Sequence, residues 1–337
     1  MNRIPFFRAG VLQRIVSYLR QVGAPVGQYL EEARIGVDQL EDPEAFVPTV
    51  FVFRFIEIAS RRAGIDDFGL RIGQNIDPFS LGSFGRTLAG SGTLGRALLT
   101  SITHRPSWHS GERVWLTRQR DVVEINHRYV VSADQPQEHA VAANLVAHLN
   151  LLNHTPPGAS PVRIGLPVPP SRAFEELPVL ANARIDFNQP RTTIAFRPET
   201  LALPLQGAAA APARDTAPPA LLPAGLVASI EAFVTSLLGV EPPRIELVAE
   251  AAGMNLRTLQ RRLAEARVTY GALVAHTRLR LARERLIASD EKIVDIALAL
   301  GYADAAHFTR AFKRWTGVPP VVYRSVHTGG DGTRCAS

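Results

Sequence analysis

Apolar side chains recur at helical spacing in three segments of the first two hundred residues. Residues 8–22, 49–63 and 138–153 each place apolar residues on one face of a helix. Two other stretches, RVWLTRQ and DVVEINH, alternate with the period of a strand and meet at Arg120 and Asp121. They predict a β-hairpin, and PVRIGLPV, ARIDFN and TTIAFRP predict further short strands. This part of the chain is therefore expected to form an α+β domain.

A composition change marks the end of that domain. The stretch GAAAAPARDTAPPALLPAG, residues 207–225, is dominated by Ala and Pro and cannot build a packed element of its own. After it, every periodic segment is helical and is bounded by Gly, Pro, Asn or Asp. We expect four parts: an α+β domain (1–206), a linker (207–224), an all-α domain (225–326) and a flexible tail (327–337).

The all-α domain contains the same helix-turn-helix pattern twice, at residues 249–266 and 297–315. In each copy a glycine allows the turn between two helices, and Asn255 or Asp304 is placed to cap the second helix. Large apolar residues four and eight positions after each cap turn one helix face into the core. The repeat predicts two helix-turn-helix motifs in one domain.

The segment between the two copies, residues 269–289, is expected to be a linker helix. About 18 helical residues span roughly 27 Å, which is close to the ~34 Å of one DNA turn. A helix of this length suits two DNA-contacting helices in successive turns of a duplex. Its arginines are expected mainly in ion pairs and on solvated surface: Arg278, Arg280, Arg283 and Arg285.

Polar side chains gather on the outward face of the second helix of each copy. An α-helix fits the DNA major groove, where Arg can donate two hydrogen bonds to guanine. Lys and more distal Arg side chains neutralise phosphates. The candidate DNA-binding residues on these faces are Arg257, Gln260 and Arg261 in the first copy, and His307, Thr309, Arg310, Lys313 and Arg314 in the second. Trp315 and Tyr323 follow the apolar stripe and are expected in the core.

The charge distribution supports a polyanionic partner. The net charge is +6, and residues 242–337 hold 15 basic and 9 acidic residues, whereas residues 1–241 hold 22 of each. A basic block of this kind favours nucleic acid first and an anionic membrane surface second.

No apolar run approaches the ~18 residues of a membrane span. The single cysteine, Cys335, allows no internal disulfide and no cysteine-based zinc site. We expect a cytoplasmic protein without membrane contact.

Two motifs suggest other chemistry and are set aside. GSGTLG at residues 90–95 fits a nucleotide-binding pattern, but a Gly-rich stretch precedes it where a hydrophobic strand is needed. Thr93 is expected to cap a helix there instead. The histidines lack the paired spacing of zinc hydrolases, so no metal site, cofactor or catalytic group is expected among His104, His109, His139, His148 and His154.

The repeated motif resembles the DNA-binding domain of the AraC/XylS family of bacterial transcription regulators over about residues 225–326. The second copy carries the resemblance at Gly301, Phe308, Arg310, Phe312, Gly317, Pro320, Tyr323 and Arg324, and the first at Ala249, Gly253, Arg257, Leu259, Gln260 and Arg261. The resemblance implies binding to direct promoter half-sites in double-stranded DNA and contact with RNA polymerase.

The resemblance also assigns roles to single residues. It implies that Arg257, Gln260 and Arg261 face bases in one major groove, and that Ala306, His307, Thr309 and Arg310 face bases in the next. The sequence departs from the family at Ala305 and Ala306, where polar residues are common. Methyl groups contact thymine but form no hydrogen bond, so weaker base readout is expected from the second helix.

The amino-terminal part resembles the arabinose-binding-type regulatory domain of the same family. Residues 68–101, FGLRIGQNIDPFSLGSFGRTLAGSGTLGRALLTS, carry this likeness. It implies that residues 1–206 bind a small effector, form a homodimer, or both, without identifying arabinose as the ligand. An effector that favours one arrangement of the domains would change contact with DNA.

Two alternative functions remain open from the sequence. One is a nucleotide-using small-molecule enzyme built around GSGTLG, and the other is a scaffold that binds DNA without sequence preference. The effector, the target genes and the sign of regulation are not predicted.

Overall fold

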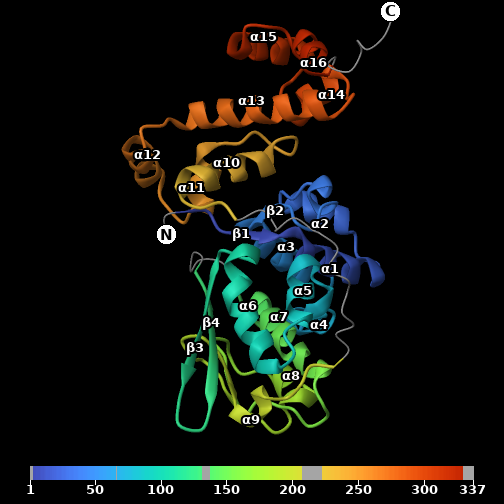
Figure 1. Cartoon of the computed structure of the whole chain (residues 1–337), viewed down its shortest axis with the longest axis vertical. Helices are drawn as coiled ribbons and strands as arrows, with labels where there is room; N and C mark the ends of the chain where they lie inside the picture. The colour runs from blue at the N-terminus through green and yellow to red at the C-terminus, as the bar shows by residue number, and fades with distance from the viewer. Residues whose placement is uncertain (1–2, 66, 131–136, 207–221, 329–337) are drawn as a thin grey trace, which may run out of the picture. The chain divides into compact units, whose positions relative to one another are not determined.

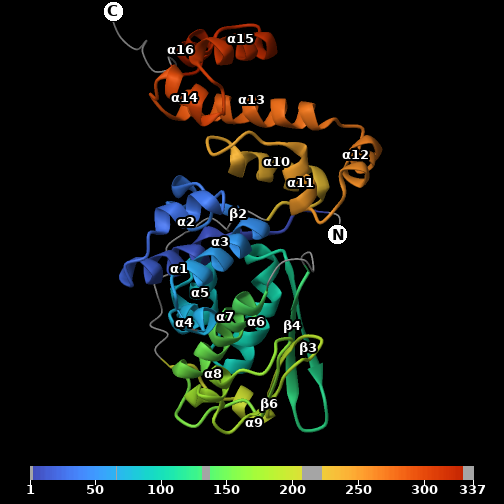
Figure 2. The same cartoon turned by 180° about the vertical axis from the view of Figure 1, so that it is seen from behind.

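The structure is a computed structural model that describes residues 3–65, 67–130, 137–206 and 222–328. Most of the predicted linker and tail lie outside these described residues. Figures 1 and 2 show the chain from opposite sides.

The chain divides into two compact units. One comprises residues 5–222, and the other comprises residues 223–337 together with residues 1–4. The sequence had placed residues 3 and 4 in the amino-terminal domain, and they group with the carboxy-terminal unit. The amide of Ile4 donates to Oγ of Ser229 at 3.0 Å, and only 1% of Ile4 is exposed. Ile4 therefore contributes to the core of the carboxy-terminal unit.

The amino-terminal unit contains a mixed sheet in the order β3-β4-β7-β5-β6. The predicted hairpin is confirmed, because β3 and β4 pair antiparallel along their whole length. β7 pairs antiparallel with both β4 and β5, and β5 pairs parallel with β6. The strands are β3 (Glu112–Arg118), β4 (Val123–Tyr129), β5 (Arg163–Gly165), β6 (Arg184–Asp186) and β7 (Thr192–Phe196).

Helices pack with this sheet and with a second, two-stranded sheet of β1 (Phe6–Arg8) and β2 (Phe46–Pro48). Apolar residues from α4, α6, α7 and the five-stranded sheet form one core, in which Leu145 and Ile164 are fully buried. The helices are α1 (Ala9–Gln21), α2 (Val26–Glu32), α3 (Thr49–Arg62), α4 (Phe68–Gln74), α5 (Gly82–Ala89), α6 (Leu94–Trp108), α7 (Glu138–Leu149), α8 (Arg172–Glu175) and α9 (Pro198–Leu201).

Two glycines bring α4 and α7 into close contact. A Cβ atom on Gly69 would lie 2.4 Å from the carbonyl oxygen of His139. A Cβ atom on Gly73 would lie 2.7 Å from Cβ of Val146. Both distances are shorter than van der Waals contact, so only glycine allows this helix spacing without displacement of α7.

The described residues of the carboxy-terminal unit form helices joined by turns and contain no strand. Helices α11 and α12 form one helix-turn-helix motif, α14 and α15 form a second, and α13 joins them. The predicted fold class, an α+β domain followed by an all-α domain with two helix-turn-helix motifs and a linker helix, is therefore confirmed. The helices are α10 (Leu226–Leu237), α11 (Ile245–Ala251), α12 (Leu256–Glu265), α13 (Tyr270–Ala288), α14 (Ile293–Ala299), α15 (Ala305–Thr316) and α16 (Pro320–Thr328).

An aromatic core fixes α15 in this unit. Phe308 and Phe312 are fully buried and their ring centroids lie 5.7 Å apart. Tyr323 of α16 packs edge-on against Phe312 at 5.3 Å. Tyr323 and Trp315, both expected in the core, are each half-buried, and Tyr323 packs against the buried cluster.

Candidate nucleic-acid interface and buried polar cluster

The second helix of each motif, α12 or α15, is here called a recognition helix. Both recognition helices begin at a residue whose side chain caps the helix. Oδ1 of Asn255 accepts a hydrogen bond from the backbone N–H of Thr258 at 2.8 Å, and Oδ1 of Asp304 accepts from that of His307 at 2.7 Å. Each cap occupies a backbone donor that the first helical turn leaves free. The two caps predicted from the sequence are therefore confirmed, and each fixes where its helix starts.

Helix α12 separates a buried face from an exposed face. Leu259 and Leu263 are buried, and the three residues expected to contact DNA from this helix are exposed. Nη1 of Arg261 lies 3.0 Å from Oε1 of Glu265, one turn further along the helix. An exposed ion pair of this kind contributes little to stability. Breaking this ion pair therefore costs little free energy, so Arg261 can turn to another acceptor. The exposed candidates are Arg257, Gln260 and Arg261.

Helix α15 presents the second set of candidate residues. Ala306, His307, Arg310, Lys313 and Arg314 are exposed, and Thr309 is half-buried. The helix has its apolar side in the core, so this polar side is available to solvent.

His307 is tied to the beginning of α15. Its Nδ1 lies 2.8 Å from Oδ2 of Asp304, the capping residue. The backbone N–H of His307, followed by its side chain, holds the pKa of Asp304 below its usual value. The imidazole is thereby positioned at the amino end of a recognition helix, where base-contacting residues of helix-turn-helix proteins lie.

The linker helix has the predicted length and separates the two motifs. Helix α13 has 19 residues, which corresponds to about 28 Å. Figures 1 and 2 show α12 at its amino end, and α14 and α16 toward its carboxyl end. This separation is similar to the ~34 Å repeat of a duplex.

The arginines of α13 already have partners, as the sequence suggested. Arg280 lies 2.9 Å from Glu284, and Arg285 lies 2.9 Å from Glu291. The guanidinium group of Arg278 stacks over Tyr302 at 4.9 Å, and that of Arg283 lies 5.9 Å from the ring of Tyr323. Four cations on the recognition helices differ: within the described part of the chain, no acidic side chain forms an ion pair with Arg257, Arg310, Lys313 or Arg314.

The GSGTLG stretch, residues 90–95, lies between two helices. Oγ1 of Thr93 accepts a hydrogen bond from the backbone N–H of Arg96 at 3.3 Å, so the predicted cap of α6 is confirmed. Helix α5, rather than a strand, precedes the stretch. The strand–turn–helix unit that positions a dinucleotide is therefore missing at this place.

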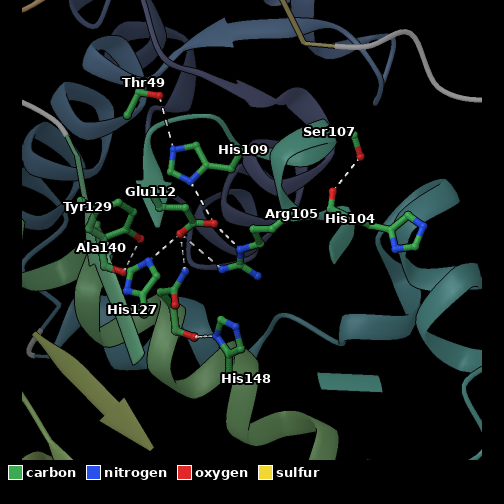
Figure 3. A network of polar contacts seen from close by, with 11 residues as sticks. Thr49, His104, Arg105, Ser107, His109, Glu112, His127, Tyr129, Ala140 and His148 are labelled. Atoms are coloured by element: carbon green, nitrogen blue, oxygen red, sulfur yellow. Dashed lines mark hydrogen bonds and ion pairs between the residues drawn. The ribbon is translucent and has the colours of Figure 1, made fainter. Parts of the chain in front are cut away.

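A buried polar cluster in the amino-terminal unit had no counterpart in the sequence analysis (Figure 3). Its centre is the carboxylate of Glu112 at the start of β3, whose side chain is completely buried. Nε of Arg105, on α6, donates to Oε1 of Glu112, and Nε2 of His127, on β4, lies 2.5 Å from Oε2. His109 and Asn144 complete the surroundings of the carboxylate: Nδ1 of His109 lies 3.2 Å from Oε1, and Nδ2 of Asn144 donates to Oε2 at 3.4 Å.

Burial and neighbouring charges determine the protonation states of this cluster. Burial alone would raise the pKa of Glu112, but Arg105 and the two histidines hold it well below its usual value. Burial, opposed by Glu112, lowers the pKa of His109. Burial, followed by the charge of Arg105, lowers the pKa of nearby His148 to about 3. At neutral pH, Glu112 is therefore a carboxylate, and His109 and His148 are uncharged.

The other histidines named from the sequence are dispersed. His154 lies 3.2 Å from Asp77, His139 packs edge-on to Phe68, and Nδ1 of His104 contacts a backbone carbonyl. Among the described residues, no group of three or more His, Cys, Asp and Glu side chains is arranged to hold a metal ion. No described helix is long and apolar enough to cross a membrane.

Comparison with known protein families assigns both units. A model of the arabinose-binding domain at the amino terminus of AraC transcription regulators matches residues 23–205, which is more than half of the chain. The chain belongs to the AraC family of transcription regulators. A helix-turn-helix domain model matches residues 248–325, which include both motifs.

Relatives of this AraC-family protein include several regulators. The ornithine utilization regulator of Pseudomonas aeruginosa is 24% identical over 322 residues, which cover 93% of this chain and 94% of that protein. The transcriptional activator NphR of Rhodococcus is 35% identical over 80 residues, 24% of each chain. The crystal structure of the regulator CdpR from Pseudomonas aeruginosa is 24% identical, with a TM-score of 0.39, and the match covers 89% of this chain and 96% of that chain.

One residue of the AraC-family signature has a structural task here. Arg324 of α16 donates from Nη2 to the carbonyl oxygen of Glu291 at 2.7 Å and from Nε to that of Leu286 at 3.3 Å. It therefore connects α16 to the end of the linker helix, and a contact with DNA is not needed to explain its presence.

Proposed function

We propose that this chain regulates transcription by placing α12 and α15 in successive major grooves of promoter DNA. The observation that carries the proposal is the contrast in ion pairing between the helices. Arginines of α13 are paired with acids or rings, whereas Arg257, Arg310, Lys313 and Arg314 are exposed without such acidic partners in the described residues. Four basic side chains without acidic partners, on two helices with defined starts, favour binding to a polyanion such as DNA.

We assign the candidate DNA-binding residues to two groups, those that contact bases and those that contact phosphates. Arg257, Gln260 and Arg261 are assigned to bases of one half-site, because they lie in the first two turns of α12. In the second half-site the base-facing set is Ala306, His307, Thr309 and Arg310. The partial burial of Thr309 limits its reach, and Ala306 offers only a methyl group. Lys313 and Arg314 lie further along α15 and are assigned to phosphates.

The amino-terminal unit is proposed to bind a small effector and to participate in dimer formation. An effector that binds one conformation more tightly shifts the population toward it and changes promoter affinity or contact with RNA polymerase. Because promoter DNA is the partner, we place this activity in the cytoplasm of a bacterium.

A competition gel shift with the full chain tests the proposal. Binding duplexes are first selected from a random-sequence pool. Unlabelled copies of the selected duplex are then compared with bulk genomic DNA as competitors. We expect the selected duplex to compete at concentrations at least about a thousandfold lower, the lower end of the range for specific DNA-binding proteins.

The same assay distinguishes a sequence-specific regulator from a nonspecific DNA-binding scaffold, and a separate turnover assay tests for an enzyme. Equal competition by all duplexes would overturn the regulator and support a scaffold that binds DNA without sequence preference. Turnover of a nucleotide by the full chain would support an enzyme. Arg184, which is exposed in the other unit and paired with Asp186, provides a control: R184A should compete like the wild type.

A further inference from the structure

A cavity lies beside the buried polar cluster in the amino-terminal unit. It has a volume of about 80 Å³ and is lined by residues of α1, α3, α5, α6 and α7 and by the segment that joins α4 to α5. Most of its wall is apolar and includes Ile15, Ile56, Ile76, Phe84 and Trp108. Such a surface suits the hydrocarbon part of a small molecule.

Among the residues that line the cavity, Glu112 is the one carboxylate, and its oxygens are occupied. Both oxygens of Glu112 already face donors, namely Arg105 and His109 at Oε1, and His127 and Asn144 at Oε2. The hydroxyl group of Tyr129 donates to the carbonyl oxygen of Ala140 at 3.2 Å. An ammonium group in this cavity would therefore be desolvated without a free carboxylate beside it, which is unfavourable.

Arg105 retains a donor at the cavity. Its Nε and Nη2 point to Glu112, but in the described part of the chain no hydrogen bond is made by Nη1. Figure 3 shows this terminal nitrogen directed away from the carboxylate. The side chain is 13% exposed and lines the cavity, so a ligand oxygen there could accept from it.

The formal charges of the residues that line the cavity are balanced. The guanidinium group of Arg105 and the carboxylate of Glu112 neutralise each other, and burial keeps His109 and His148 uncharged. A second carboxylate would add a negative charge beside a guanidinium group that is already paired with Glu112, at a high desolvation cost.

We infer that this cavity binds a small, uncharged, mainly apolar molecule with one carbonyl oxygen, which accepts a hydrogen bond from Nη1 of Arg105. The ligand is the effector of the proposed regulator, so its regulatory meaning rests on the proposed function. Binding itself is measured without DNA, and its failure would leave promoter recognition unaffected.

Cavity size selects the probe. A water-sized group needs about 10–15 Å³ of such volume, so this cavity accommodates roughly five to eight of them. The ketone 2-hexanone falls in this range. Hexanoate and hexylamine have a similar size and differ mainly in charge. Titrations of the three compounds into the full chain, followed by saturation-transfer NMR, compare the ligand classes directly.

Two variants test the location. Val11→Phe adds a ring to the cavity wall, and the double variant Arg105→Met/Glu112→Gln removes the donor while keeping the site free of net charge. Leu99→Phe on exposed α6 surface controls for added size, and Arg163→Met/Glu124→Gln removes another ion pair of the same unit. Circular dichroism and thermal unfolding establish that each variant is folded.

We expect saturable binding of 2-hexanone that is at least about tenfold tighter than that of hexanoate or hexylamine. Val11→Phe and the Arg105/Glu112 double variant should each weaken it about tenfold, and the two controls should not. Equal or tighter binding of either charged compound would overturn the inference. So would the absence of saturable 2-hexanone binding, or undiminished binding by folded Val11→Phe.

Discussion

His148 shows how strongly one buried side chain can link stability to pH. Its imidazole is buried near Arg105, and Nδ1 contacts the carbonyl oxygen of Asn144 at 2.7 Å. Its pKa is about 3 in the folded protein, against an ordinary value of 6.5 for a solvated histidine. Between these two values, the unfolded chain therefore binds a proton that the folded chain does not. The free energy of unfolding falls as pH decreases from 6.5 toward 3.

Replacing this histidine should reduce that pH dependence. For His148→Gln we expect the slope of unfolding free energy against pH to decrease by up to about 1.4 kcal/mol per pH unit within this window. Urea unfolding between pH 4.5 and 6, followed by fluorescence of Trp108 and Trp115 in a Trp315→Phe background, measures it. Exposed His104→Gln is the control and should keep the wild-type slope, and an unchanged slope in His148→Gln would contradict the assignment.

The recognition helices allow a second comparison at the residue scale. Arg310→Ala should cost about 1–3 kcal/mol at the selected duplex and relax preference at one base position, because it removes a base contact. Lys313→Ala should weaken selected and unselected duplexes by similar factors, because it removes a phosphate contact. Quantitative gel shifts on both duplexes distinguish these effects, and a uniform loss in Arg310→Ala would reassign that arginine to the backbone.

At the scale of elements, the close approach of α4 and α7 depends on glycine. Gly73→Ala would bring Cβ to 2.7 Å from Val146 and 2.9 Å from the carbonyl oxygen of Ala143, so we expect a destabilisation of about 1–3 kcal/mol. Gly27→Ala on α2 meets nothing within 4 Å and should be neutral or stabilising by about 0.5–1 kcal/mol. Urea unfolding of both variants measures the difference, and equal stability would contradict the packing.

Structural elements that depend on residues close together in the chain were predictable from the sequence. Helix caps depend on one residue and its next three neighbours, so Asn255 and Asp304 identified the starts of α12 and α15. The predicted helix 138–153 was too long, because the α-helix ends at Leu149 and a short 3-10 helix follows. The side chain of Asn150 donates to the carbonyl oxygens of residues 73 and 76 in and just after α4, a long-range contact that periodicity does not encode.

The buried polar cluster was not predictable for the same reason. Arg105, Glu112, His127 and Asn144 come from four different elements, and their spacing in the chain has no local meaning. Their types are also common on solvated surfaces, where charged side chains are usually found. Only the pairing of β3 with β4, and the packing of α6 and α7, brings them together.

At the scale of the whole molecule, charge is distributed unequally along the chain. The excess of basic residues falls entirely within residues 242–337. The salt dependence of DNA affinity should therefore originate in the carboxy-terminal unit, because each neutralised phosphate releases a counterion.

Paired substitutions test this distribution. Lys313→Gln with Arg314→Gln should reduce the slope of log affinity against log salt by about two, because both side chains are assigned to phosphates. Arg61→Gln with Arg184→Gln, two exposed arginines of the amino-terminal unit, should leave the slope unchanged. Fluorescence anisotropy across a salt series measures both, and an equal decrease in the two variants would contradict this origin.

The hydrogen bond from Ile4 to Ser229 has a practical consequence for dissecting this regulator. The carboxy-terminal unit is discontinuous in sequence, so a truncated fragment that begins after the linker lacks a side chain that is 1% exposed in the intact protein. Chimaeras that join a foreign sensory module to residue 223 lack the same buried side chain.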